Sequence, residues 1–231
     1  MTAMILRLLE DRLPAGGDPV YLPQARRAIY VAAGHVTIEF ADGCTHVAAE
    51  AAWLGEGEIA YLPAEDARLL RFELIPSLAE DTGQLRAAPA ATSKVKLSMD
   101  IDLDPGFGWL MRCDRVSFPP GGIAHTHVHQ GPGIRYCLEG EIRVESGGTM
   151  SRYGAGDAWF EDGREPVLAP TTEAAATSFL RCFLLPRACK GRSSIRYARS
   201  EDAAKPKTQR YRVLGERFIA LDGTASASRP A

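Results

Sequence analysis

The chain has 231 residues and a formal net charge of −2, with 45% hydrophobic and 24% charged residues, and this composition is typical of a soluble globular protein. The small net charge argues against nucleic acid or an anionic membrane surface as the main partner. The five cysteines include no C-x-x-C pair, which argues against a disulfide framework and a thiolate zinc site. The apolar run in "MTAMILRLLEDRLP" is broken by charges and too short for a membrane span, so we expect a cytoplasmic protein.

Period-two alternation of apolar residues predicts a chain made mostly of short strands. It is clear in "HVTIEF" (35–40), "EIRVES" (141–146) and "FLRCFLLP" (179–186), and clusters of Gly, Pro and Asp separate such runs at short intervals. Helix is expected only at the N-terminus and near residues 77–86. Many short strands with frequent turn signals predict a β-sandwich or barrel.

The two halves of the chain resemble each other. Three blocks match in the same order: 28–40 with 134–146, 54–63 with 153–162, and 69–76 with 179–186. The pattern predicts a duplicated β-domain. We divide the chain into a first barrel over 1–80, an Ala/Pro-rich linker over 81–98, a second barrel over 99–187, and a basic arm with a disordered tail over 188–231.

The second half carries a motif of known type. In "GGIAHTHVHQGPGIRYCLEGEI" (121–142), four residues match the first cupin motif, G-x5-H-x-H-x3-E-x6-G: Gly121, His127, His129 and Gly140. The second cupin motif is present in outline over 154–167. The second half therefore resembles a cupin and, through the repeat, the chain resembles a bicupin. The resemblance implies an all-β protein with two jelly-roll barrels in tandem and little helix.

The histidines at every second position predict a metal site. Side chains at i and i+2 on a strand lie on one face, so His127 and His129 can bind one ion. Imidazole suits Fe, Mn, Ni, Zn and Cu, and two histidines with one carboxylate form a facial site for one such divalent metal. His125 has the same parity but lies about 13 Å along an extended strand from His129. We expect His125 to be a catalytic pocket group that handles protons, unless a bulge bends the strand.

Two of the four usual cupin ligands are absent. The glutamate of the first motif falls on Gly133, and the late histidine of the second motif falls on Pro166 or Val167. Glu161 and Glu165 are the nearest carboxylates, and we take Glu161 as the candidate third metal ligand. A barrel without metal, whose histidines are only polar pocket groups, is the alternative.

Alternate residues of a strand share a face, so Arg135 is expected to point inward like position 133. Its guanidinium can there bind a carboxylate or phosphate of a ligand. A salt bridge to an internal Glu is the alternative for Arg135. In the first barrel, the positions that align with the two histidines and the glutamate of the motif are occupied by Tyr21, Pro23 and Arg27. We expect that barrel to be structural, and an anion site built on Arg27 and Arg68 is a weaker alternative.

After Pro186 the chain turns basic, with nine Lys or Arg in residues 187–213. No DNA-reading element accompanies them, so we expect an arm that wraps a neighbouring barrel and adds a strand over 210–221.

The leading function is a metal-dependent enzyme for a small polar, anionic organic molecule, with dioxygenase, lyase, decarboxylase and isomerase chemistry left open. A non-catalytic binding or sensing barrel without metal is the alternative. The spare barrel and the arm predict a homodimer.

Overall fold

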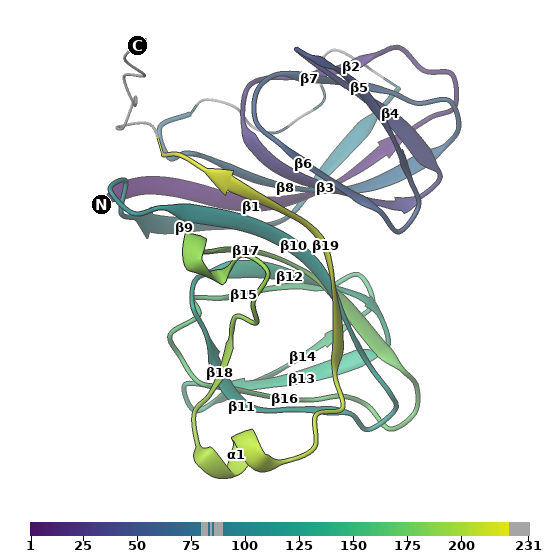
Figure 1. The fold of residues 1–231 in the computed structure, drawn as a ribbon. Coiled ribbons are helices and arrows are strands. Elements are labelled where there is room, and N and C mark those ends of the chain that lie inside the picture. The colour runs from purple at the N-terminus through teal and green to yellow at the C-terminus, as the bar shows by residue number, and fades with distance from the viewer. Residues whose placement is uncertain (80–82, 84, 86–89, 222–231) are drawn as a thin grey trace.

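The computed structural model describes residues 1–79, 83, 85 and 90–221, and nearly all of its regular structure is β (Figure 1). The helix expected at the N-terminus is wrong, because Thr2–Leu13 form strand β1. This strand lies between two other strands and is buried on both faces, with Leu6 and Leu8 on one face and Leu9 beside the buried charged residues Arg7 and Asp11 on the other, so it shows no apolar–polar alternation. The second expected helix, near residues 77–86, lies largely outside the described residues. None of the described helices is long and apolar enough to span a membrane.

The first barrel consists of two sheets with strand orders β6-β3-β8-β1-β9 and β2-β7-β4-β5. Short turns connect most of its strands, as the clusters of glycine and proline predict. Besides β1, its strands are β2 (Val20–Leu22), β3 (Arg26–Ala33), β4 (His35–Phe40), β5 (Gly43–Ala48), β6 (Ala52–Gly55), β7 (Ile59–Leu62), β8 (Ala67–Pro76) and β9 (Thr92–Leu103).

The second barrel has sheets with strand orders β15-β12-β17-β10-β19 and β14-β13-β16-β11-β18. A 3-10 turn at Arg187–Cys189 and the short helix α1 (Ser200–Ala204) lie within its C-terminal arm. Its strands are β10 (Trp109–Phe118), β11 (Ile123–His129), β12 (Gly133–Glu139), β13 (Glu141–Ser146), β14 (Thr149–Gly154), β15 (Ala158–Glu161), β16 (Val167–Pro170), β17 (Thr177–Pro186), β18 (Ile195–Tyr197) and β19 (Arg210–Ile219).

The internal repeat of the sequence corresponds to a repeat of topology. Strands β3, β8 and β1 pair in the same order as β12, β17 and β10. The register of β3 with β8 shifts between Val31 and Ala33, and that of β12 with β17 shifts between Cys137 and Glu139, which are the matching positions of the repeat. The two halves are therefore two jelly-roll barrels of the same design.

Part of the predicted linker lies in a strand, and the predicted arm, including its expected strand over 210–221, packs on a barrel. Residues 92–98, placed in the linker, form the first part of β9, which pairs with β1. The arm packs on the second barrel of its own chain, where β18 pairs with β11 and β19 pairs with β10. Both β9 and β19 are edge strands with many exposed polar residues, so an apolar pattern does not mark them.

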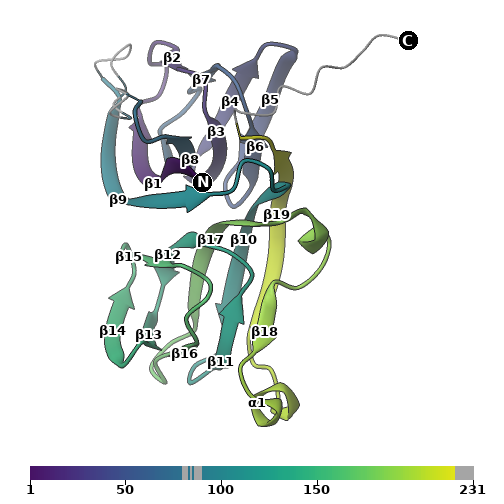
Figure 2. The same cartoon turned by 90° about the vertical axis from the view of Figure 1, so that its left-hand side faces the viewer.

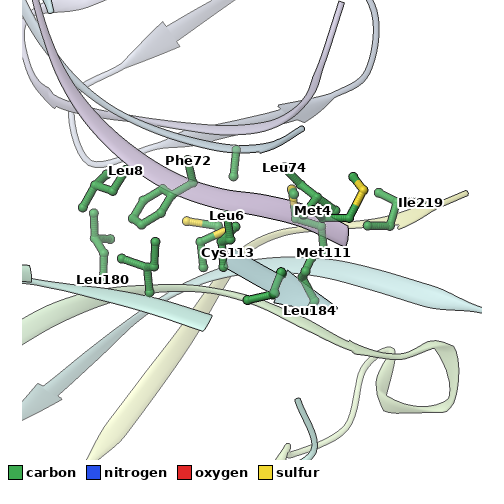
Figure 3. Packing of buried hydrophobic residues seen from close by; sticks show 14 of the residues in the cluster. Met4, Leu6, Leu8, Phe72, Leu74, Met111, Cys113, Leu180, Leu184 and Ile219 are labelled. Atoms are coloured by element: carbon green, nitrogen blue, oxygen red, sulfur yellow. The ribbon is translucent and has the colours of Figure 1, made fainter. Parts of the chain in front are cut away.

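The largest apolar cluster lies between the barrels. Leu6, Leu8 and Phe72 of the first barrel face Cys113 and Leu180 of the second, and all five are fully buried (Figure 3). The sheets that carry them pack face to face (Figure 2). Each barrel also has its own interior cluster. The second interior is only partly filled, and that is where the candidate site lies.

Candidate functional site

The second barrel encloses a cavity of about 30 Å³, measured as the volume open to the centre of a water molecule. Because atoms extend beyond the volume open to their centres, this leaves room for an ion together with a molecule of a few heavy atoms. The walls are largely apolar, with side chains such as Val116, Phe118 and Phe179. Six polar or charged side chains reach into it: His127, His129, Arg135, Glu161, Arg181 and Gln209.

His127 and His129 point their Nε2 atoms at each other across 3.3 Å. Both side chains are buried, with 5% of each residue exposed. Two nitrogens about 2.1 Å from one metal ion, at an angle of 90–110°, lie about 3.0–3.4 Å apart. The shared face that the alternation predicted for this pair is therefore present, at a spacing suited to one ion.

Both imidazoles are held in the neutral form that binds metals. His127 Nδ1–H donates to the carbonyl oxygen of His125 over 2.8 Å, which leaves the Nε2 lone pair free, and Ser194 Oγ lies 3.4 Å from His129 Nδ1. Burial lowers the pKa of His127. Burial, followed by the positive charges of Arg135 and Arg181, lowers the pKa of His129 well below its usual value.

Glu161 supplies a carboxylate beside the histidine pair. Trp159 Nε1–H donates to Glu161 Oε1 over 2.8 Å, while Oε2 lies 3.8 Å from His129 Nε2. Arg135 Nη2 lies 2.8 Å from the same Oε2, close enough for an ion pair. The two groups are not aligned for a hydrogen bond, so Oε2 and Nη2 are both buried without a hydrogen-bond partner among the described residues. A buried carboxylate oxygen in this state is available to a further ligand.

Two buried arginines make the cavity electrically balanced. Arg135 donates through Nη1 to the carbonyl of Gly133 over 2.6 Å, and burial lowers its pKa. Arg181 makes a two-pronged ion pair with Asp114 through distances of 2.8 and 2.9 Å. The internal salt bridge, which was the alternative for Arg135, is therefore present, and its Nη2 atom makes no aligned hydrogen bond among the described residues.

His129 lies close to both of the other expected metal ligands, His127 and Glu161, and the donor types of the three suit a divalent transition metal. The distances of 3.3 and 3.8 Å from His129 Nε2 to its two neighbours lie within the range of about 3.0–4.2 Å that two donors of one ion span. Imidazole and carboxylate are suitable donors for such an ion. Over the described ranges, however, no three His, Cys, Asp or Glu side chains form a tight metal-binding cluster.

Packing explains one of the two missing cupin ligands. A Cβ atom on Gly133 would lie 2.2 Å from Phe183 Cβ and 2.7 Å from the carbonyl oxygen of Cys182, so no glutamate fits there. Val167, at the late histidine position, pairs with His127 across β11 and β16 and lines the cavity with an apolar side chain.

His125 does not share the face of the other two histidines. The register of β11 with β16 shifts between Ala124 and His127. Ala124 pairs with Ala169 and His127 with Val167, so β11 has one more residue than β16 over this stretch. This bulge reverses the parity, and Ala124 lines the cavity where His125 does not. Only the backbone carbonyl of His125 supports the site, through its contact with His127.

The first barrel holds an ion network where the second holds its cavity. Arg27 donates to Glu73 Oε1 over 2.8 Å and to the carbonyls of Gly57 and Pro23, so all three of its nitrogens are engaged. Arg68 lies at the other end of β3, opposite Ala33. The two arginines are thus separate and do not form the anion site that was the weaker alternative.

The sequence analysis missed several groups of the site. Arg181 stands in the middle of an apolar strand, and the repeat places Arg71 at the same position of the first copy, which was a usable signal. Ser194, Ile195 and Gln209 come from the arm, and no local pattern connects them with the histidines.

Comparisons with known proteins agree with this architecture. A family model described as a cupin domain matches residues 114–167. No curated protein matches the chain. Among solved structures, the fold is similar to AerE from Microcystis aeruginosa, with 11% identity, a TM-score of 0.55 and coverage of 79% of this chain and 88% of that one. It is also similar to a variant of oxalate decarboxylase from Bacillus subtilis, with 15% identity, a TM-score of 0.59 and coverage of 87% and 73%. The segment that matches the cupin domain contains the histidine pair, the same barrel is repeated before it, and the chain therefore has the fold of two cupin barrels in tandem.

Proposed function

We propose that the second barrel is a metal-dependent enzyme site for a small anionic organic molecule. One observation carries the proposal: two neutral, buried imidazoles with Nε2 atoms 3.3 Å apart lie beside a carboxylate oxygen of Glu161 that has no hydrogen-bond partner among the described residues. His127, His129 and Glu161 would hold the ion. When bound, a divalent metal of this kind polarises a carbonyl or carboxylate oxygen and lowers the pKa of bound water.

Charge and size favour a small anion as the substrate. The two arginines and two carboxylates of the site, Arg135, Arg181, Asp114 and Glu161, balance to zero, so a divalent ion gives the cavity a positive charge. Arg135 can then orient a substrate carboxylate through Nη2. The cavity of about 30 Å³ favours a molecule with few heavy atoms. His125 has no part in this proposal, because its side chain does not line the cavity.

The second candidate is a binding or sensing barrel without metal. Arg135 Nη2, which makes no aligned hydrogen bond among the described residues, and the nearby guanidinium of Arg181 favour it, because these donors can hold a small acid without an ion. In that case the neutral histidines serve as hydrogen-bonding groups of the pocket.

Metal content separates the two candidates. Protein purified without a histidine tag is supplied in turn with Fe, Mn, Ni, Zn and Cu, and bound metal is measured by elemental analysis. We expect one ion per chain, lost in His127→Ala and His129→Ala and retained in His125→Ala. Failure of the wild type to bind any of the five ions stoichiometrically would exclude the enzyme proposal and leave the metal-free barrel.

A further inference from the structure

The C-terminal arm forms part of the cavity wall. In Figure 2 it descends along β18 to α1 and returns as β19, on the side of the barrel where β11 lies. His129 pairs with Ile195 of the arm, and Thr208 Oγ1 accepts a hydrogen bond from Ile123 N over 2.9 Å. These contacts hold the arm beside the histidine strand.

A buried arginine holds the two ends of the arm together. Arg112, 1% exposed, donates to the carbonyl oxygens of Cys189 and Arg192 near the start of the arm. Its Nε also donates to Glu216 Oε1 over 2.6 Å, near the end of the arm. The arm is therefore a fixed part of the barrel, and its cavity-facing side chains have defined positions.

Gln209 is the polar side chain that the arm contributes to the cavity lining. Its Nε2–H donates to the hydroxyl oxygen of Tyr197 over 3.4 Å, which turns the other end of the amide away from Tyr197. The oxygen at that end, Oε1, is buried and has no hydrogen-bond partner among the described residues. Buried acceptors nearly always receive a hydrogen bond in folded proteins. We therefore expect a bound molecule to donate one to this oxygen.

We propose that Gln209 determines ligand specificity by accepting a hydrogen bond from a hydroxyl group of the ligand. Arg135 Nη2, on the same cavity, lies in an ion pair with Glu161 but makes no aligned hydrogen bond, and a carboxylate of the ligand provides an acceptor for one. The ligand class is a small hydroxy acid, whose carboxylate faces Arg135 and whose hydroxyl faces Gln209. This inference rests on the proposed function for its assumption that the cavity is a ligand site, and it does not require the metal.

The test compares two small acids that differ by one hydroxyl group, glycolate and acetate. Their dissociation constants are measured by NMR titration for the wild type, for Gln209→Leu, and for Gln24→Leu, which changes an exposed glutamine in the first barrel. We expect the preference for glycolate to fall about fivefold to tenfold in Gln209→Leu, with acetate binding unchanged, and to stay the same in Gln24→Leu. Gln209→Met, which is close to glutamine in length, replaces the leucine variant if that variant unfolds.

An unchanged preference in the Gln209 variants, or a wild type that binds neither acid, overturns the inference. Bound metal is measured in the same samples. Metal binding with an unchanged preference refutes the role of Gln209 and leaves the proposed enzyme intact. A Gln209-dependent preference in protein that binds no metal supports this inference and refutes the metal enzyme.

Discussion

At the scale of single residues, close packing decides which ligands the second barrel can carry. Gly133 and Phe183 lie opposite each other on β12 and β17, and the Cβ and backbone atoms of Phe183 take the space next to a position where the cupin motif has glutamate. Glu161, on the neighbouring strand and opposite Gly133, brings its carboxylate to the histidines instead. The carboxylate of the site is therefore supplied from a different strand.

The Gly133→Ala variant tests this packing. The added Cβ would lie 2.2 Å from Phe183 Cβ, and overpacking of this kind costs about 1–3 kcal/mol. We expect a lower free energy of unfolding in urea. Gly154→Ala is the control, because a Cβ there meets only Asp157 Oδ2 at 3.8 Å. Equal stabilities of the two variants would show that β12 and β17 can accommodate a Cβ atom at position 133, opposite Phe183.

The buried histidines should make the metal-free protein less stable in mild acid. The folded pKa values of His127 and His129 lie below 6.5, the usual value for the unfolded chain. As the pH falls below about 6.5, the unfolded chain binds more protons than the folded one, so stability decreases until the folded pKa values are passed. Urea unfolding between pH 7.5 and 5 should show a smaller loss in the His127→Gln/His129→Gln double variant. The exposed His46→Gln variant should follow the wild type, and a wild-type-like curve for the double variant would contradict the prediction.

At the scale of elements, β1, β3 and β8 fill the first barrel with a network of buried ion pairs. Glu73 on β8 accepts hydrogen bonds from three arginines on these strands, Arg7, Arg27 and Arg71, at 2.7–2.8 Å. Burial raises the pKa of Glu73, but the three guanidinium groups lower it by more, to about 2. The network takes the place of a ligand cavity, which supports a structural role for this barrel.

Removing the charge of Glu73 should destabilise the fold without affecting the second barrel's ligands. Glu73→Gln leaves three buried guanidinium groups without their shared anion, and breaking a buried pair in this way costs about 3–5 kcal/mol. Chemical denaturation should show the loss, while metal content stays that of the wild type. The stability from Glu73 is present above the usual pKa of 4.5 and decreases as the pH falls toward 2. Loss of metal from a Glu73→Gln protein that remains folded would show that the metal site does not lie in the second barrel.

At the scale of the whole molecule, the apolar layer between the barrels makes them one folding unit. The first barrel contributes Leu6 and Phe72, the second contributes Met111 and Leu184, and each is at most 1% exposed. Separation of the barrels would expose this layer to water. The degenerate barrel therefore covers an apolar face of the barrel that carries the site.

Leu6→Ala tests this shared core. The variant removes a fully buried side chain and should lower the free energy of unfolding by about 2–5 kcal/mol. We expect one urea transition for both barrels, followed by circular dichroism and by tryptophan fluorescence. Leu78→Ala, at a side chain 94% exposed, should be neutral. Two separate transitions in the wild type would show that the barrels fold independently.

We also propose that the chain forms a homodimer. Strands β5 and β14 each pair with one neighbour in the described structure, β4 and β13 respectively, and lie at the outer edges of their sheets. Such edges offer backbone groups to a second copy. Light scattering should give twice the mass of one chain at micromolar concentrations, and the mass of a single chain throughout would contradict this proposal.

Most of the strands, the duplication and the histidine pair could be predicted from the sequence, because alternation, turn residues and motif spacing are local properties of the chain. Only the tertiary structure decided which side chains share the cavity. A bulge after Ala124 turns the His125 side chain away from the cavity. The pairing of β15 with β12 places Glu161 beside Arg135. The arm brought Gln209, 80 positions beyond His129, to the same cavity. Such contacts depend on register and strand pairing between distant segments, and no window of sequence contains them.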